Sequence, residues 1–107
     1  MITALTDLNI WDGQAASSAD SIVFERSKIM SICSIDDVPH QAKTISCGGA
    51  TALPGLMDAH VHMELDPNHK QAPKKTDPKQ IGPMRIRAGQ MVKAGITTAR
   101  DLGGGAW

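Results

Sequence analysis

Aromatic residues are scarce in this sequence, and charge of one sign is not in excess. The 107 residues include two tryptophans, one phenylalanine and no tyrosine, and 11 basic residues are balanced by 11 acidic ones. So few aromatic side chains provide no stacking platform for bases, and a balanced charge provides no basic field to attract a phosphate backbone. We therefore expect no nucleic-acid partner.

Long hydrophobic runs are also missing. No apolar run approaches the roughly 18 residues that a membrane-spanning helix needs, and residues 1–7 lack the basic start and apolar core of a signal peptide. The two cysteines, Cys33 and Cys47, fit no paired-cysteine metal motif, and we expect both to be free thiols. These absences predict a cytoplasmic protein with no membrane partner. The length predicts one compact unit with one modest core.

The first fifty residues contain short β-prone pieces separated by turn signals. We expect strands over residues 2–5, 8–11 and 44–47, and a hairpin over residues 21–33 that turns at Arg26 and Ser27. Asp12 and Gly13 form a strong tight-turn signal, because glycine accepts a positive φ without strain. The turn at Arg26 has no glycine, so the hairpin register is only loosely defined.

The second half alternates between extended and helical patterns. Residues 56–63 and 96–101 predict strands, residues 64–80 a polar loop, and residues 102–107 a flexible end. Between them, apolar residues at helical spacing predict a helix from Pro83 to Lys93, ending before Gly95. A helix that connects two strands indicates a parallel β-α-β unit and an α/β architecture.

The strand over residues 56–63 contains the candidate metal-binding residues. Side chains of a strand alternate between its faces, which places Asp58, His60 and His62 on one face and apolar residues on the other. Two histidines at this spacing can bind one ion at zinc–nitrogen distances of about 2.0–2.1 Å. The short pattern also fits a chance surface pair or two histidines satisfied within a core. Catalytic zinc sites use three protein ligands, so a metal site requires a further ligand.

Several residues are candidates for that further ligand, each with an ordinary alternative. Asp58 would bind the metal or orient a histidine, and Asp101 would face the same cavity or form an ion pair with Arg100. His40 and His69 lie in predicted loops, where solvated histidines are common. Nothing in the sequence places the two cysteines near this strand.

The segment Pro-Gly-Leu-Met-Asp-Ala-His-Val-His at residues 54–62 resembles the amidohydrolase superfamily of metal-dependent hydrolases. That family opens its (β/α)₈ barrel with a Pro-Gly-x-x-Asp-x-His-x-His strand, and both histidines bind the metal. Residues 94–104, Ala-Gly-Ile-Thr-Thr-Ala-Arg-Asp-Leu-Gly-Gly, resemble its second barrel strand and exit loop. This version of the second strand is most similar to the imidazolonepropionase-like and the dipeptidase or prolidase-like branches.

The resemblance implies an α/β fold with an N-terminal β region. Residues 1–53 correspond to the N-terminal arm of a small β-sandwich, and residues 54–107 to the start of the (β/α)₈ barrel, up to its second strand. His60 and His62 are then metal ligands, Asp58 orients the pair, and Arg100 and Asp101 border the pocket. Two sequence departures affect only the sandwich: the turn at Arg26 lacks the usual glycine, and Ser46-Cys47 replaces an acidic residue.

The implied activity is hydrolysis of an amide or other C–N bond, including dipeptide-like substrates, with one or two divalent metal ions, zinc above all. In relatives the other metal ligands and the catalytic base lie beyond the position of residue 107. We therefore expect the isolated chain to be inactive. Its expected partner is the remainder of the barrel, in cis or as a second chain, within an oligomer.

Two alternatives remain open. A small metal-binding β module of cupin type also uses His-x-His, but its glutamate follows several residues after the second histidine, whereas Glu64 comes only two after it. A non-catalytic fragment or interaction module would fold stably without metal.

Overall fold

The computed structural model describes residues 1–65, 68 and 81–103 of the chain. It divides into two compact units, residues 1–54 and residues 55–107. The expectation of one compact unit is therefore wrong. The expectation of one modest core holds for the described residues, because all four buried apolar side chains, Ala4, Leu8, Ile10 and Val23, lie in the first unit.

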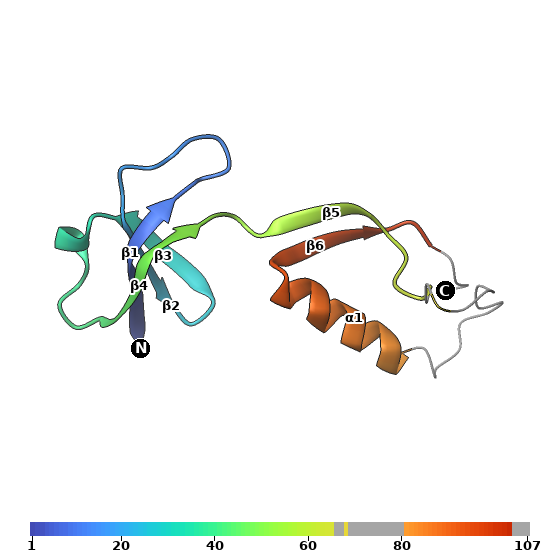
Figure 1. Ribbon diagram of the computed structural model, residues 1–107. Coiled ribbons are helices and arrows are strands. Elements are labelled where there is room, and N and C mark those ends of the chain that lie inside the picture. The colour runs from blue at the N-terminus through green and yellow to red at the C-terminus, as the bar shows by residue number, and fades with distance from the viewer. Residues whose placement is uncertain (66–67, 69–80, 104–107) are drawn as a thin grey trace. The chain divides into compact units, whose positions relative to one another are not determined.

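The first unit is a mixed four-stranded sheet in the order β3-β2-β1-β4 (Figure 1). Its strands are β1 (Ile2–Ile10), β2 (Ser21–Glu25), β3 (Lys28–Cys33) and β4 (Lys43–Ala52). Strand β1 pairs antiparallel with β2 and parallel with β4, and β2 pairs antiparallel with β3. The β-rich N-terminal region predicted from the sequence is confirmed.

The centre of this sheet holds the core because β1 has a neighbour on both sides. In its second half Thr6, Leu8 and Ile10 are buried while Asp7 and Asn9 are exposed, which is the period of two expected of a strand with one covered face. Val23 of β2, only 2% exposed, completes this core. Leu8 also donates its N–H to the Asp20 carbonyl, which ties the loop before β2 to the central strand.

Two predicted strands at the N-terminus form one strand in the structure. The pieces 2–5 and 8–11 join into β1 because Asp7 adopts a left-handed φ of 58°, and the pairing with β4 shifts register between Thr6 and Leu8. Opposite it, Gly48 and Gly49 have φ values of 59° and 76°, so β4 continues through the glycines instead of ending at residue 47. The predicted loop after β3 contains a short 3-10 helix, η1 (Ile35–Asp37).

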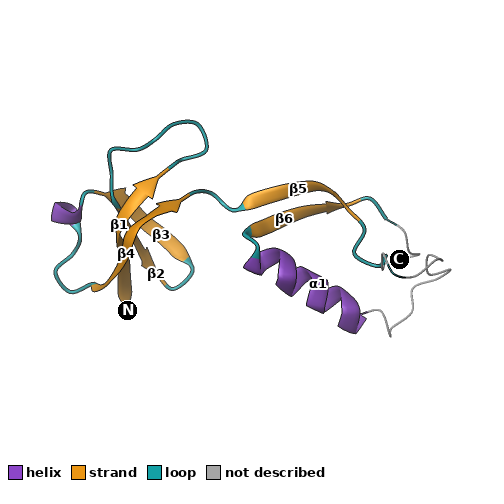
Figure 2. Ribbon diagram, in the orientation of Figure 1, coloured by secondary structure: helices purple, strands orange, loops and turns teal. Residues whose placement is uncertain are grey.

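The second unit contains β5 (Leu56–Val61), α1 (Ile81–Lys93) and β6 (Ile96–Asp101), as Figure 2 shows. Strands β5 and β6 are parallel, so the predicted strand-helix-strand unit is confirmed. The helix begins two residues before the predicted Pro83, which lies in the first turn, where its missing N–H costs no hydrogen bond. After the helix, Gly95 takes a φ of 87°, and its carbonyl accepts the Leu56 N–H at 2.9 Å.

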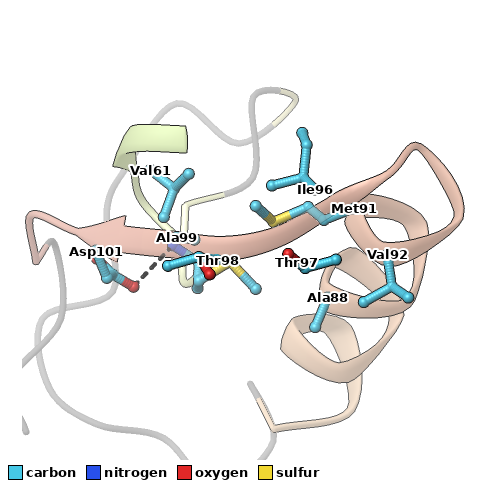
Figure 3. Close-up of a pocket in the computed structure, with 10 residues that line it drawn as sticks. Val61, Ala88, Met91, Val92, Ile96, Thr97, Thr98, Ala99 and Asp101 are labelled. Carbon is cyan, nitrogen blue, oxygen red and sulfur yellow. Dashed lines mark hydrogen bonds between the residues drawn. The ribbon is translucent and has the colours of Figure 1, made fainter. Parts of the chain in front are cut away.

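The helix and the two strands enclose an open hollow of about 200 Å³ (Figure 3). Its lining is mostly apolar and includes Val61 from β5, Met91 from α1 and Ala99 from β6. Among the described residues of this unit no apolar side chain is buried, and Met57 is 77% exposed. The apolar face predicted for this strand therefore exists but is only partly covered within the chain.

Some predictions fall outside the described residues. They are most of the loop over residues 64–80, including His69, and most of the predicted flexible end over residues 102–107. Within the described part of the chain, no helix is long and apolar enough to span a membrane.

Candidate functional site

The two histidines of the His-x-His motif meet at the C-terminal end of β5. His60 is exposed within the strand, and His62 is half-buried and follows it directly. Their Nε2 atoms lie 3.3 Å apart, and the ring centroids are 5.2 Å apart with the planes at 73°. The pair is therefore close enough for both Nε2 atoms to contact one ligand.

The backbone that brings the rings together differs from the predicted regular strand. Strand β5 ends at Val61, and its pairing with β6 shifts register between Asp58 and Val61. One extra residue therefore lies on the β5 side of the ladder, as in a β-bulge. The prediction that His62 belongs to a continuous strand is wrong, because the regular pairing stops before it. The rings nevertheless converge.

A carbonyl group fixes the orientation of one ring. His62 Nδ1 forms a hydrogen bond with the main-chain oxygen of Gly103, in the exit from β6. A carbonyl oxygen only accepts, so Nδ1 must carry the proton. In the neutral imidazole this leaves a lone pair on Nε2, the atom that faces His60. The second strand thus selects the tautomer in which His62 can bind a metal through Nε2.

The distance between the two nitrogens suits a shared metal ion. Two nitrogens on a tetrahedral zinc ion at about 2.0–2.1 Å are separated by about 3.3 Å. The Nε2 atoms of His60 and His62 have this separation. The donor set also fits, since neutral imidazole is a common zinc ligand. No other His, Cys, Asp or Glu of residues 1–65, 68 and 81–103 joins them in a cluster of three that could hold a metal ion.

Asp58 acts on the strand backbone. Its Oδ1 accepts a hydrogen bond from the His60 main-chain N–H at 3.0 Å. Within the described residues no hydrogen bond connects Asp58 to either imidazole. Asp58 therefore contributes to the pair by holding the peptide of His60, and its direct contact with a ring or a metal stays a prediction.

The two residues predicted to border the pocket both connect β6 to the end of β5. Arg100 Nε donates to the Ala59 carbonyl at 2.9 Å. Asp101 accepts from the Met63 N–H at 3.2 Å through Oδ2 and from the Gly103 N–H at 2.8 Å through Oδ1. The only ion pair among the described residues joins the N-terminus to Glu25, so the alternative of an Arg100–Asp101 ion pair is not realised there.

The other candidate ligands are not part of this arrangement. His40, Cys33 and Cys47 belong to the first unit, and both cysteines are free thiols, as predicted. His69 lies outside the described residues.

One buried acidic residue near the pair was not predicted. Glu64 is 4% exposed, and neither of its carboxylate oxygens has a hydrogen-bond partner among the described residues. Its spacing, two residues after His62, is the only signal in the sequence. The turn that buries it is held by Leu65, whose N–H donates to the His62 carbonyl, and by Arg87 of α1, whose Nη1 donates to the Met63 carbonyl.

The relatives of this chain were found by comparing its structure with solved structures. No protein-family model matches the sequence, and no curated protein matches it. A solved Xaa-Pro dipeptidase with methionine bound in its active site is 30% identical with a TM-score of 0.75, over 96% of this chain and 27% of that one. An enamidase described as a member of the amidohydrolase superfamily is 26% identical with a TM-score of 0.63, over 96% of this chain and 26% of that one.

A third neighbour shows the same fold at lower identity. A prolidase complexed with N-methylphosphonate-L-proline is 20% identical with a TM-score of 0.73, over 94% of this chain and 26% of that one. This chain spans about a quarter of the length of these solved chains. The neighbours are hydrolases, and they match almost all of the described chain.

Proposed function

This chain has the fold of the N-terminal portion of amidohydrolase-superfamily enzymes, and from that premise we propose that it supplies part of a metal-dependent hydrolase that cleaves amide or related C–N bonds. In this proposal residues 1–53 are the arm of a β-sandwich, and residues 54–107 begin a (β/α)₈ barrel. The rest of the barrel is supplied in cis or by a second chain, and the complete protein is an oligomer in the cytoplasm.

The observation that carries the proposal is the pairing of the two histidines. His60 and His62 present Nε2 atoms 3.3 Å apart, and the Gly103 carbonyl holds His62 in the tautomer that leaves Nε2 unprotonated. Two unprotonated nitrogens at this distance repel each other unless a proton, as in a hydrogen bond from His60 Nε2–H, or a cation lies between them. A divalent cation at this position would accept the Nε2 lone pairs of both histidines.

We assign zinc as the ion, one or two per complete site, with His60 and His62 as ligands. When bound, such an ion lowers the pKa of a bound water to about 7 and polarises a carbonyl group. The residues of this chain hold and orient the ligands: Asp58 fixes the peptide of His60, and Gly103 fixes the ring of His62. Arg100 and Asp101 connect the two strand ends, where barrel enzymes place their active sites.

The isolated chain is not expected to hydrolyse substrate. A catalytic zinc site uses three protein ligands, and the described residues provide two in one place. The catalytic base would likewise come from the remainder of the barrel. The neighbours that act on dipeptides and related compounds support a small amide or dipeptide-like substrate, as in the prolidase-like branch.

A zinc titration followed at the histidine side chains tests the proposal. We expect the imidazole signals of His60 and His62 in the ¹⁵N-labelled chain to shift together, even if binding is weak. Replacing either histidine by alanine should lower the zinc affinity at least tenfold. His40→Ala is the matched control, because His40 lies in the other unit, and it should leave the affinity unchanged.

Two results would contradict this assignment. One is an absence of any shift at His60 and His62 up to millimolar zinc. The other is equal loss of affinity in His40→Ala. The inactive-fragment prediction has its own test, because metal-dependent amide hydrolysis by the purified 107-residue chain would overturn it.

A further inference from the structure

The end of β5 and the end of β6 are joined through one carboxylate. Asp101 receives the Met63 N–H on Oδ2 and the Gly103 N–H on Oδ1. Met63 follows His62 directly in the chain, and Gly103 is the residue whose carbonyl contacts the His62 ring. Asp101 therefore bonds the N–H groups of the residue after His62 and of the residue whose carbonyl contacts its ring, and among the described residues it has no hydrogen bond to the imidazole. Figure 3 draws one hydrogen bond of Asp101 as a dashed line.

We propose that Asp101 is a positioning residue for His62. Its two oxygens hold the backbone of both strand ends at the separation that lets the Gly103 carbonyl accept the Nδ1 proton of the ring. The inference deepens the proposed function, on which it rests, by naming the residue that sets the tautomer of one ligand. It adds a role for Asp101 to the predicted one of bordering the pocket, which stays a prediction.

A carboxylate suits this position for a specific reason. Each of its two oxygens accepts one N–H, and hydrogen bonds to a charged acceptor are shorter and stronger than neutral ones. An asparagine has one acceptor oxygen and would keep only one of the two contacts. Gly103 contributes through its backbone, because its φ of 85° is a left-handed conformation that other residues rarely adopt. Asp101 and Gly103 together direct one carbonyl oxygen towards Nδ1.

Two further contacts surround the same peptides. Arg87 Nη1 donates to the Met63 carbonyl at 2.7 Å, so both backbone polar groups of Met63 are hydrogen-bonded. The Leu102 N–H donates to the Val61 carbonyl at 3.0 Å. These bonds hold the backbone where Asp101 acts, but neither of them reaches Gly103. Asp101 bonds both the residue after His62 and the residue whose carbonyl contacts its ring.

The tautomer of His62 in the metal-free 107-residue chain is the direct test. Long-range ¹H–¹⁵N spectra distinguish a proton on Nδ1 from one on Nε2. We expect His62 to carry its proton on Nδ1 in the natural chain. In Asp101→Asn and Asp101→Ala we expect a mixture of both tautomers, with a larger Nε2–H fraction in the alanine variant. Zinc affinity should fall by about tenfold or more, as for other residues that orient metal ligands.

Two further variants keep the test decisive. Gly55→Ala is a control for stability, because it should destabilise the same unit without changing the hydrogen bonds of Asp101. We expect the His62 tautomer to be unchanged in this variant. Gly103→Ala should give a mixture of His62 tautomers although Asp101 is unchanged. If Asp101→Ala does not fold, the His62 tautomer in Asp101→Asn is the test, because asparagine keeps one acceptor oxygen. A folded Asp101→Asn whose His62 remains fully protonated on Nδ1 would overturn the proposal.

The two proposals fail separately. If the natural chain shows the Nδ1–H tautomer and Asp101 controls it, but zinc does not bind, the positioning role stands and the metal function falls. If zinc binds to His60 and His62 equally well in the natural chain and in Asp101→Asn, the positioning role falls and the metal site stands.

Discussion

Gly55 and Thr97 approach so closely that a side chain at Gly55 has no room. A Cβ atom at Gly55 would lie 2.8 Å from Thr97 Cβ, closer than real Cβ atoms approach one another. The glycine of the Pro-Gly pair therefore allows the start of β5 to lie against β6. Its position is a packing requirement within the second unit.

Gly55→Ala should lower the free energy of unfolding of this unit by about 1–3 kcal/mol, the usual cost of overpacking. Gly89→Ala is the matched control: nothing lies within 4 Å of its added Cβ, and it sits within α1. We expect it to stabilise the helix by about 0.5–1 kcal/mol, since alanine favours helices over glycine. Urea unfolding followed by circular dichroism measures both. An unchanged midpoint for Gly55→Ala would contradict the packing argument.

Arg26→Gly should stabilise the first unit. The two-residue turn between β2 and β3 places Arg26 at a φ of 55°, a left-handed conformation that costs a non-glycine residue about 1–2 kcal/mol. Glycine removes this cost, although it loses more chain entropy on folding, so we expect a net gain of about 1 kcal/mol. Ser27→Gly is the control, because Ser27 has no positive φ and should gain nothing. Equal thermal midpoints for the natural chain and Arg26→Gly would refute this.

The loop after β1 should show an acid-dependent stability. Hydrogen bonds from the N–H groups of Ala15 and Gln14 to Asp12 Oδ1, at 2.8 and 2.7 Å, lower the pKa of this exposed carboxyl below its usual value. Because the folded pKa is the lower one, the stabilisation is fully present above the unfolded pKa of about 3.9 and is lost as the pH falls through the folded value.

Asp12→Asn isolates this contribution, since asparagine keeps an acceptor but does not titrate. The stability advantage of the natural chain over Asp12→Asn should shrink as the pH falls below about 4. Asp37→Asn, in the exposed 3-10 helix η1, is the control. A carboxyl titration of Asp12 by NMR gives the pKa directly, and a value at or above that of a free aspartate would contradict the hydrogen-bonding account.

Periodicity and turn chemistry predict much of this fold from sequence. The bounds of β6 at residues 96–101, the end of α1 at Lys93 and the turn at Arg26 and Ser27 all agree with the sequence. These features depend on neighbouring residues, which is the information that a local pattern contains. The tight turn at Gly13 also has the positive φ that was expected, at 106°.

The features that sequence patterns missed depend on distant partners. Asp7 keeps β1 continuous because β4 offers Gly48 and Gly49 opposite it, 41 and 42 residues further on. Asn9 Nδ2 also donates to the Gly49 carbonyl at 2.7 Å. No local pattern encodes such a match.

The candidate site shows the same limit. The sequence suffices to predict that His60 and His62 are neighbours, because their spacing is local. The carbonyl of Gly103 and the carboxylate of Asp101 enter only through the pairing of β5 with β6. Glu64 has no local signature of burial at all, since an acidic residue after a strand is ordinarily exposed.

The parallel pairing of β5 with β6 has a consequence for the order of events during synthesis. The acceptor for His62 lies 41 residues later in the chain, beyond α1 and β6. A ribosome must therefore release nearly the whole second unit before the ring of His62 can be fixed, and contacts between such distant residues form slowly because a long loop must close first. Until then the two imidazoles belong to a nascent strand without its parallel neighbour, so the ring of His62 is fixed only after β6 and Gly103 have been made.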